Sequence, residues 1–162
     1  MILSADASVL RFTNSIIGPP TQGNDVFAAI GGAVVVSFST VLGIATCTNT
    51  AAVCSGAGAN GVCFDNSIVA NLTTGAPANT ISGQSCAATY TLAFPQAAAL
   101  PGAGNKIGMN PKFKNPSASD LHLDTGSPAI DAANPTATLG VDFDGKARPH
   151  GAQRDLGAFE YP

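Results

Sequence analysis

The sequence predicts an all-β domain, and three observations support this class. Gly and Pro supply 18 and 11 of the 162 residues, which leaves few good helix formers outside Ala. Val, Ile, Thr and Phe stand in short runs bounded by Gly, Pro and Asn, as is typical of short strands joined by turns. The chain has the length of one domain with a buried core, and 45% apolar against 10% charged residues excludes intrinsic disorder.

Three segments in the first half of the chain resemble one another: LRFTNSIIG (10–18), VVSFSTVLG (35–43) and VCFDNSIVA (62–70), with a weaker fourth copy in TYTLAF (89–94). Aligned on their last small residue, the three are 25 and 27 residues apart. A β-rich repeat of this length predicts a parallel β-helix, here a short solenoid of about three to four coils. In such coils Asn14, Ser39 and Asn66 would occupy equivalent bends and form a ladder.

Charge is distributed unevenly along the chain. Among residues 1–105 only Asp6, Arg11, Asp25 and Asp65 are charged, whereas the remaining 57 residues carry 13 charges. We therefore expect β-helix coils with loop insertions over 1–105 and a last coil with a C-terminal cap over 106–162, in one continuous domain. The net charge of −3 argues against nucleic acid as a partner, and no apolar run reaches the roughly 18 residues of a membrane span.

The four cysteines are Cys47, Cys54, Cys63 and Cys86, and their spacing fits no zinc motif. Their even number in a chain of low charge predicts up to two disulfides and an oxidising compartment. All three pairings are open, as is the alternative of four buried thiols, and Cys47–Cys54, which would close a small loop, is the first choice. No signal peptide follows Met1, so we expect the native protein to begin further upstream.

From residue 110 the sequence reads NPKFKNPSASDLHLDTGSPAIDAANP, followed by VDFDGKARP and RDLGAFEYP. Prolines on both sides restrict the chain around Phe113, which we expect to point inward. Leu121 and Leu123 alternate with polar residues, as in a half-exposed strand. Leu156 and Phe159 are expected to bury against the last coil, because a solenoid exposes an apolar end that must be covered.

These pieces resemble the C-terminal signature of secreted bacterial right-handed parallel β-helix repeat proteins, the choice-of-anchor Q-like proteins. The motifs GSPAID, DFDG, RP and DLGAFEY occur in order, and the resemblance covers about residues 110–161. The chain departs from it at Asn110, where the family often has Asp, and at Ala133-Asn134, where it often has Gly. The resemblance implies a right-handed β-helix and a secreted or cell-surface location. Because many right-handed β-helices cleave polysaccharides, it also implies a carbohydrate partner or an enzyme.

The C-terminal segment holds the main candidate site residues: Asp131, Asp142, Asp144, Arg148, Asp155 and Glu160. We interpret them as an internal polar network in which Arg148 pairs with Asp131 or Asp155 and braces the cap. The alternative is calcium bound by Asp142 and Asp144, whose DFDG stretch resembles the opening of a calcium loop but lacks its further ligands. No other metal or cofactor is predicted.

No catalytic residue is predicted. His122 lies on the exposed phase of a strand and His150 in a loop, and neither has a serine or cysteine nucleophile in a suitable context. Arg11, Asp25 and Asp65 are widely separated, whereas glycoside hydrolysis needs two close carboxylates.

The expected function is therefore that of a non-catalytic extracellular module, the C-terminal end of a larger protein. It would act as cap and scaffold and contact a polysaccharide or a protein. Lys106, Lys112 and Lys114 form a small basic cluster, interpreted as solvated surface, with a site for acidic glycans as the alternative. Two other functions stay open: a polysaccharide lyase or hydrolase with its active site in upstream coils, and a self-assembling dimer or fibre element. In the latter the open end near residues 3–18 would bind upstream coils or a second copy.

Overall fold

The computed structural model describes residues 9–18, 25–27, 32–47, 61–73, 75–76, 78–83 and 86–162. Across these residues the regular elements are β-strands, apart from one 3-10 turn, η1 (Pro116–Ala118), so the predicted all-β class is confirmed. None of the described residues belongs to a helix long and apolar enough to cross a membrane. The expected loop insertion at 46–60 and the start of the first coil lie largely outside the described residues.

The described residues form four sheets, of which three are parallel. The first contains β1 (Val9–Thr13), β4 (Ala33–Ser37), β7 (Gly61–Asp65) and β10 (Cys86–Thr89), paired in this order. The second contains β2 (Ile16–Ile17), β5 (Thr40–Leu42), β8 (Ile68–Ala70), β11 (Leu92–Phe94) and β12 (Lys106–Ile107). The third contains β3 (Asp25–Phe27), β6 (Ile44–Thr46) and β9 (Ile81–Ser82), and a small antiparallel sheet contains β13 (Phe113–Asn115) and β14 (Asp120–Leu123).

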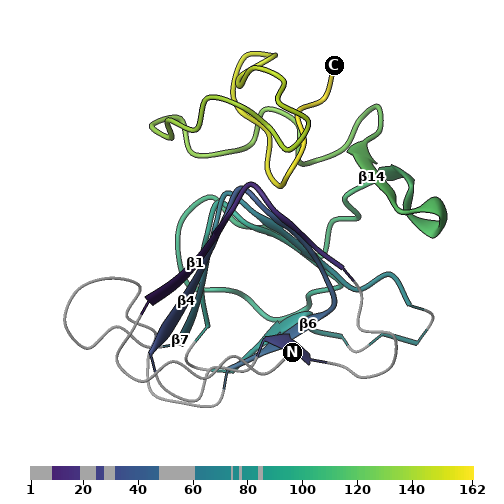
Figure 1. Cartoon of the computed structure of the whole chain (residues 1–162). Helices are drawn as coiled ribbons and strands as arrows, with labels where there is room; N and C mark the ends of the chain where they lie inside the picture. Colours follow the sequence, from purple (N-terminus) through teal and green to yellow (C-terminus); the bar gives the residue numbers. More distant parts are fainter. Residues whose placement is uncertain are drawn as a thin grey trace.

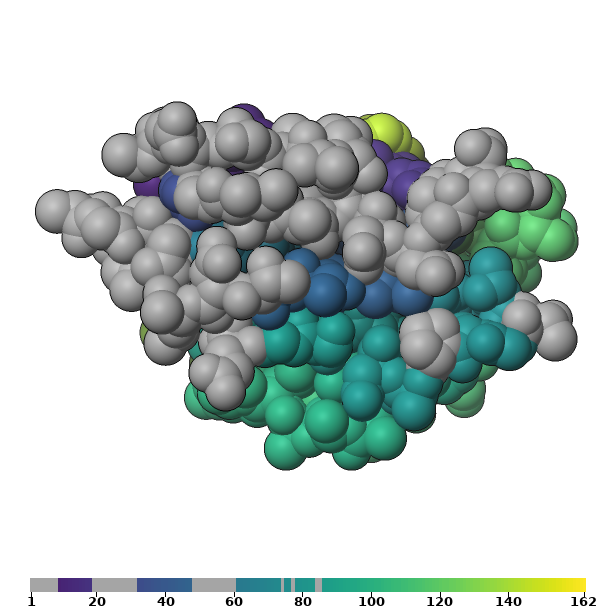
Figure 2. All heavy atoms as spheres, turned by 90° about the horizontal axis from the view of Figure 1, so that it is seen from below, coloured from purple at the N-terminus to yellow at the C-terminus, as the bar shows by residue number. Residues whose placement is uncertain are grey.

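From β1 to β11 the chain runs through the three parallel sheets in turn and returns to the first sheet after every third strand, and β12 then adds to the second sheet beside β11. We call one such circuit a pass. Figure 1 shows the three sheets as the sides of a triangle, with successive passes behind one another. Figure 2 shows the same passes as layers, from blue through teal to green in chain order. The first three similar segments contain most of the first two strands of their passes, whereas the fourth contains β11 and only the last residue of β10.

The register of these strands differs by one residue from the sequence alignment. Ala70 pairs with Leu42 and not with Gly43, so the small residues that end the segments are not equivalent. Gly43 lies one position after the residue that pairs with Ala70, between β5 and β6. Its φ is 144°, and its N–H donates to the carbonyl of Ala70. In the first two sheets, paired residues of the second and third pass are therefore 28 positions apart, as in the Ser39–Ser67 contact.

An apolar core fills the inside of the triangle. Inward-facing side chains from all three sheets form it: Val34, Val36, Val41, Ala45, Val62, Phe64, Val69, Ile81, Ala88 and Ala93. A disulfide between Cys47 and Cys86 lies in the same core and joins the second pass to the fourth. The expected Cys47–Cys54 pairing is therefore wrong, because strand stacking brings residues 39 positions apart to a Cα separation of 5.5 Å. Cys63 is also disulfide-bonded, whereas Cys54 lies outside the described residues.

A second apolar cluster lies outside the triangle, along one corner. It joins Phe38, Ile68 and Leu92 to residues of the C-terminal segment (110–162): Phe113, Leu121, Leu123, Ala129, Ala133, Leu156, Ala158 and Phe159. Figure 1 shows this segment beside the apex of the triangle. Phe113, Leu121 and Leu123 are buried as predicted. The expectation that the segment covers the end of the last coil is wrong, since its apolar residues cover the outward face of several passes.

The end of the stack is closed by a shorter stretch, residues 95–105. Gln96 is buried, and its Oε1 accepts the N–H groups of Thr80 and Ile81 at 3.0 and 2.9 Å, while its Nε2 donates to the carbonyl of Ile81. Asn105 donates to the carbonyl of Ala88 at 2.8 Å. Leu100 packs against the inner core. Two side-chain amides thus take the place of neighbouring strands at the edges of β9 and β10.

Candidate functional site

The first and second sheets meet at a corner where the backbone of every pass has an unusual conformation. One residue of each pass is left-handed there: Asn14, Phe38, Asn66 and Tyr90, with φ values of 52°, 46°, 49° and 44°. The predicted ladder of Asn14, Ser39 and Asn66 is therefore corrected at its middle member, where Phe38 stands. A left-handed residue is uncommon outside Gly and Asn, so this column marks a bend that the packing imposes.

The next residue of each pass carries a hydroxyl group. In all four passes this hydroxyl donates to the carbonyl two residues earlier, at 2.8–2.9 Å: Ser15, Ser39, Ser67 and Thr91. The oxygens of Ser39 and Ser67 also accept the N–H of the preceding rung, at 3.1 and 3.2 Å. At the last rung the oxygen of Asn105 accepts the N–H of Thr91 at 3.0 Å. The hydroxyl column therefore satisfies buried backbone groups where the strands break off.

The C-terminal segment binds this corner through backbone hydrogen bonds. Gly157 donates its N–H to the carbonyl of Asn66 at 2.9 Å, and Ala158 donates to the hydroxyl of Thr40 at 3.0 Å. Asn134 donates its N–H to the side-chain oxygen of Asn66 at 2.6 Å. Asn66 is therefore bound by two separate parts of the C-terminal segment, which fixes the segment across the second and third pass.

Arg148 lies at the centre of the C-terminal segment. Its guanidinium is fully buried and pairs with Glu160, also buried, with 2.7 Å between Nη1 and Oε1. It also donates to the carbonyls of Asp155 at 3.0 Å and Gly157 at 2.7 Å. Its Cζ lies 5.0 Å from the ring centroid of Phe38, a cation–π contact with the corner. Burial lowers the pKa of Arg148, and the neighbouring carboxylates oppose this shift.

The ion-pair partner of Arg148 corrects the sequence expectation, which had named Asp131 or Asp155. The Asp155 carboxylate instead accepts the backbone N–H groups of Asp131 at 2.7 Å and Tyr161 at 2.6 Å. Burial raises the pKa of Asp155 to about 6, although these two hydrogen bonds act in the opposite direction. Asp131 itself is exposed and accepts the N–H of Gln153 at 2.7 Å.

Asp142 is buried and organises the loop that follows it. Its Oδ1 accepts the N–H groups of Asp144 and Lys146 at 2.9 and 2.8 Å, and its Oδ2 accepts that of Glu160 at 3.0 Å. The two aspartates of the predicted calcium pair therefore differ in their surroundings: the Asp142 carboxylate is buried and binds backbone N–H groups, while Asp144 is exposed. Within the described ranges no three His, Cys, Asp or Glu side chains are placed to hold a metal ion.

Asp144 belongs to a surface cluster around His122. The imidazole Nδ1 lies 2.6 Å from Asp120 Oδ1, and Nε2 lies 2.8 Å from Asp144 Oδ2. Lys146 adds an ion pair to Asp144 at 3.5 Å, and the ring stacks on Phe159 with centroids 4.1 Å apart. Although partial burial alone would lower the pKa of His122, its bonds to Asp144 and Asp120 raise it. The same bonds to His122 lower the pKa of each aspartate.

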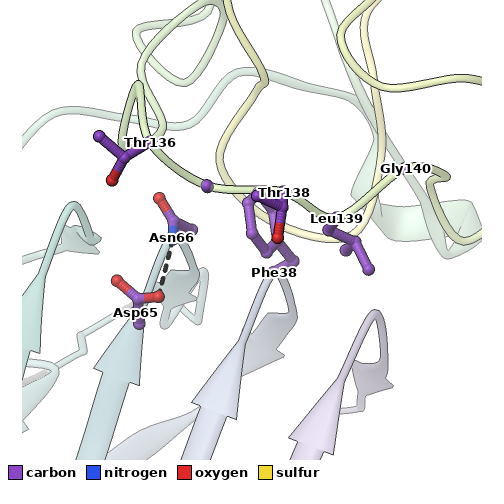
Figure 3. A pocket seen from close by; sticks show the side chains of 8 residues that line it. Phe38, Asp65, Asn66, Thr136, Thr138, Leu139 and Gly140 are labelled. Carbon is purple, nitrogen blue, oxygen red and sulfur yellow. Dashed lines mark hydrogen bonds between the residues drawn. The ribbon is translucent and has the colours of Figure 1, made fainter.

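A groove of about 480 Å³ opens between the corner and residues 134–140, which we name the strap. Figure 3 shows Asp65 and Asn66 on one side and Phe38 below Thr138 and Leu139 on the other. Asp65 is half-buried; its Oδ2 accepts the side-chain amide of Asn66 at 2.7 Å, and its Oδ1 accepts the hydroxyl of Thr89 at 3.0 Å. The groove combines hydrogen-bonding and apolar surface, which is typical of a small-molecule site.

The other charged residues named from the sequence are scattered. Arg11 is exposed on β1, which β4 separates from the strand that carries Asp65. Only the backbone of Asp25 is described. The three lysines lie on β12, before β13 and within β13: Lys106, half-buried, and Lys112 and Lys114, both exposed. His150 is exposed, and its backbone N–H donates to Glu160 at 3.1 Å.

Sequence reasoning missed three residues that shape this region: Gln96, Asn105 and Phe38. Polar amides in an Ala- and Gly-rich stretch carry no periodic signal, so nothing marked Gln96 or Asn105 as strand substitutes. Phe38 stands between two serines. Its place in the repeat was hidden because the sequence segments align on Gly43, whereas Leu42 is the residue that pairs with Ala70.

Comparison of the chain with models of protein families, with curated proteins and with solved structures found no match. The likeness of the C-terminal motifs to choice-of-anchor Q-like proteins therefore stays a prediction from the sequence.

Proposed function

We propose that the chain is a closing module of a right-handed parallel β-helix, an extracellular scaffold that ends a stack of coils and presents its corner to a glycan or a protein. Recurrence of every third strand in the same parallel sheet supports the β-helix, and right-handed connection is the rule for parallel strands. The Cys47–Cys86 disulfide supports an oxidising, extracellular location.

The observation that carries this function is the pair of amides at the end of the stack. A last coil exposes unpaired N–H and C=O groups, which recruit further strands. Gln96 contributes three hydrogen bonds to the edge of β9, and Asn105 satisfies backbone at both ends of the bend after β10. Residues with this arrangement end a sheet and do not continue it.

The C-terminal segment supports the same interpretation. Its buried charged groups, Arg148, Asp142, Asp155 and Glu160, bond to one another and to backbone groups. They hold the segment in shape against the corner, which is a structural use of ionisable groups.

The closing function is tested by opening the edge. The double variant Gln96→Ala/Asn105→Ala should keep its β-sheet circular dichroism but form dimers and larger species, because two strand edges become available. Light scattering at a series of concentrations measures the mass, and Asn115→Ala, an amide removed on the exposed surface next to η1, is the matched control. A folded double variant with the mass of the wild type at every concentration would contradict the proposal.

A further inference from the structure

The groove between the strap and the corner has walls of two kinds. One wall is polar: the Asp65 carboxylate, the Asn66 amide and the hydroxyls of Thr136 and Thr138, both exposed residues. The other consists of Phe38 and Leu139. Figure 3 shows the two threonines on the strap and Asp65 opposite them, at the end of its strand.

The polar wall keeps capacity for a ligand. Each Asp65 oxygen accepts one protein hydrogen bond, from Thr89 or from Asn66, whereas an ionised carboxylate has about four acceptor positions. These two bonds also fix the orientation of the carboxylate before a ligand arrives. A ligand that donates hydroxyl groups would therefore meet a preorganised acceptor.

The apolar wall is held rigidly. Phe38 is 5% exposed, and Arg148 approaches its ring, as described above. Two hydrogen bonds anchor the strap above it. The backbone N–H of Asn134 donates to the side chain of Asn66, and the backbone N–H of Arg148 donates to the carbonyl of Gly140 at 3.0 Å. The strap is thus held over Phe38 by hydrogen bonds at both of its ends.

The charge of the lining selects the ligand class. Asp65 is the ionisable residue among the described lining residues, so an anionic ligand would meet like charge and would find no cation among these residues. We propose that the groove binds a neutral saccharide, whose hydroxyls reach Asp65 and the threonines while a C–H face lies toward Leu139. This rests on the glycan contact in the proposed function and names its site and ligand class.

The test is a titration of ¹⁵N-labelled protein with neutral trisaccharides (maltotriose, cellotriose and triacetylchitotriose) and with trigalacturonate as the anionic counterpart. At least one neutral trisaccharide should shift the amide signals of residues 136–140 in a saturable way, and trigalacturonate should not. Asp65→Asn and Thr138→Val should each weaken binding by about tenfold. This is the effect of losing one hydrogen bond, to the carboxylate in the first variant and to the hydroxyl in the second. Ser117→Ala, an exposed hydroxyl on η1, should bind like the wild type.

Three outcomes would overturn the proposal: no shift in the strap with any neutral trisaccharide at about 10 mM, equal binding of trigalacturonate, or wild-type affinity in Asp65→Asn. None of these results bears on the closing function, because neither Gln96 nor Asn105 is among the residues that line the groove. Failure of the edge variants to associate would likewise leave the groove proposal standing.

Discussion

Replacement of Arg148 by Met is the sharpest test of the C-terminal segment, because the methionine keeps most of the aliphatic stem and removes the charge. Glu160 would stay in place at 1% exposure without its cation, and the carbonyls of Asp155 and Gly157 would lose their donors. Breaking a buried ion pair costs about 3–5 kcal/mol, and each lost hydrogen bond about 1 kcal/mol.

We therefore expect Arg148→Met to lower the free energy of unfolding by about 5 kcal/mol, or the Tm by about 10–20 °C for a domain of this size. Denaturant unfolding without reductant measures the change. Arg154→Met is the control: that side chain is half-buried and donates one bond, at 2.8 Å, to the carbonyl of Leu139, so about 1 kcal/mol is expected.

A double-mutant cycle separates the ion pair from packing. In Arg148→Met/Glu160→Gln the side chain at position 160 no longer carries a buried charge without its cation, so the double variant should be about 2 kcal/mol more stable than the sum of the single effects. A loss below about 1 kcal/mol in Arg148→Met, or additive single effects, would refute the assignment of Glu160 as its partner.

Three further predictions concern other contacts. Hydrogen bonds raise the pKa of His122 in the folded state, so its stabilising effect should be full below about pH 6.5 and vanish as pH rises through the folded pKa. NMR titration and unfolding at pH 6 and 8 check this, and the difference in stability between the two pH values should be smaller in His122→Phe. Gly157→Ala should cost about 3 kcal/mol, because φ is +87° and a Cβ would lie 2.8 Å from neighbouring side-chain atoms, whereas Gly140→Ala, with open space around it, should change Tm little. Cys47→Ala/Cys86→Ala should cost about 4 kcal/mol in non-reducing denaturant unfolding, since the disulfide closes a loop with a sequence separation of 39, and unchanged stability would contradict its role.

The fold class could be predicted because short β-rich runs between Gly, Pro and Asn leave no room for helices. The placement of the C-terminal segment could not. The continuous run Ile68-Val69-Ala70, buried throughout, carried the relevant signal, since a strand buried on both faces needs cover outside as well as inside. The sequence alone offered no reason to prefer this outer face over the end of the stack.

The sequence indicated which charged residues of the candidate site bury together, but not which carboxylate pairs with Arg148. Arg148, Asp142, Asp155 and Glu160 do bury together, as their density in a sparsely charged chain indicated. Which carboxylate meets Arg148 depends on how the backbone folds between them. The Asp155 side chain is occupied by the N–H groups of Asp131 and Tyr161, and this leaves Glu160 for the guanidinium. The groove brings Asp65 to residues some seventy positions later, a proximity that no local pattern encodes.

The attachment of Gly157 and Ala158 to Asn66 and Thr40 has a consequence for how the chain is made. On a ribosome the N-terminal passes emerge first and can stack as they appear, yet the outer face of β5 and β8 keeps part of its apolar surface in water until residues 156–159 have also been synthesised. A nascent chain that stalls before residue 157 would therefore present a half-covered sheet to chaperones and proteases.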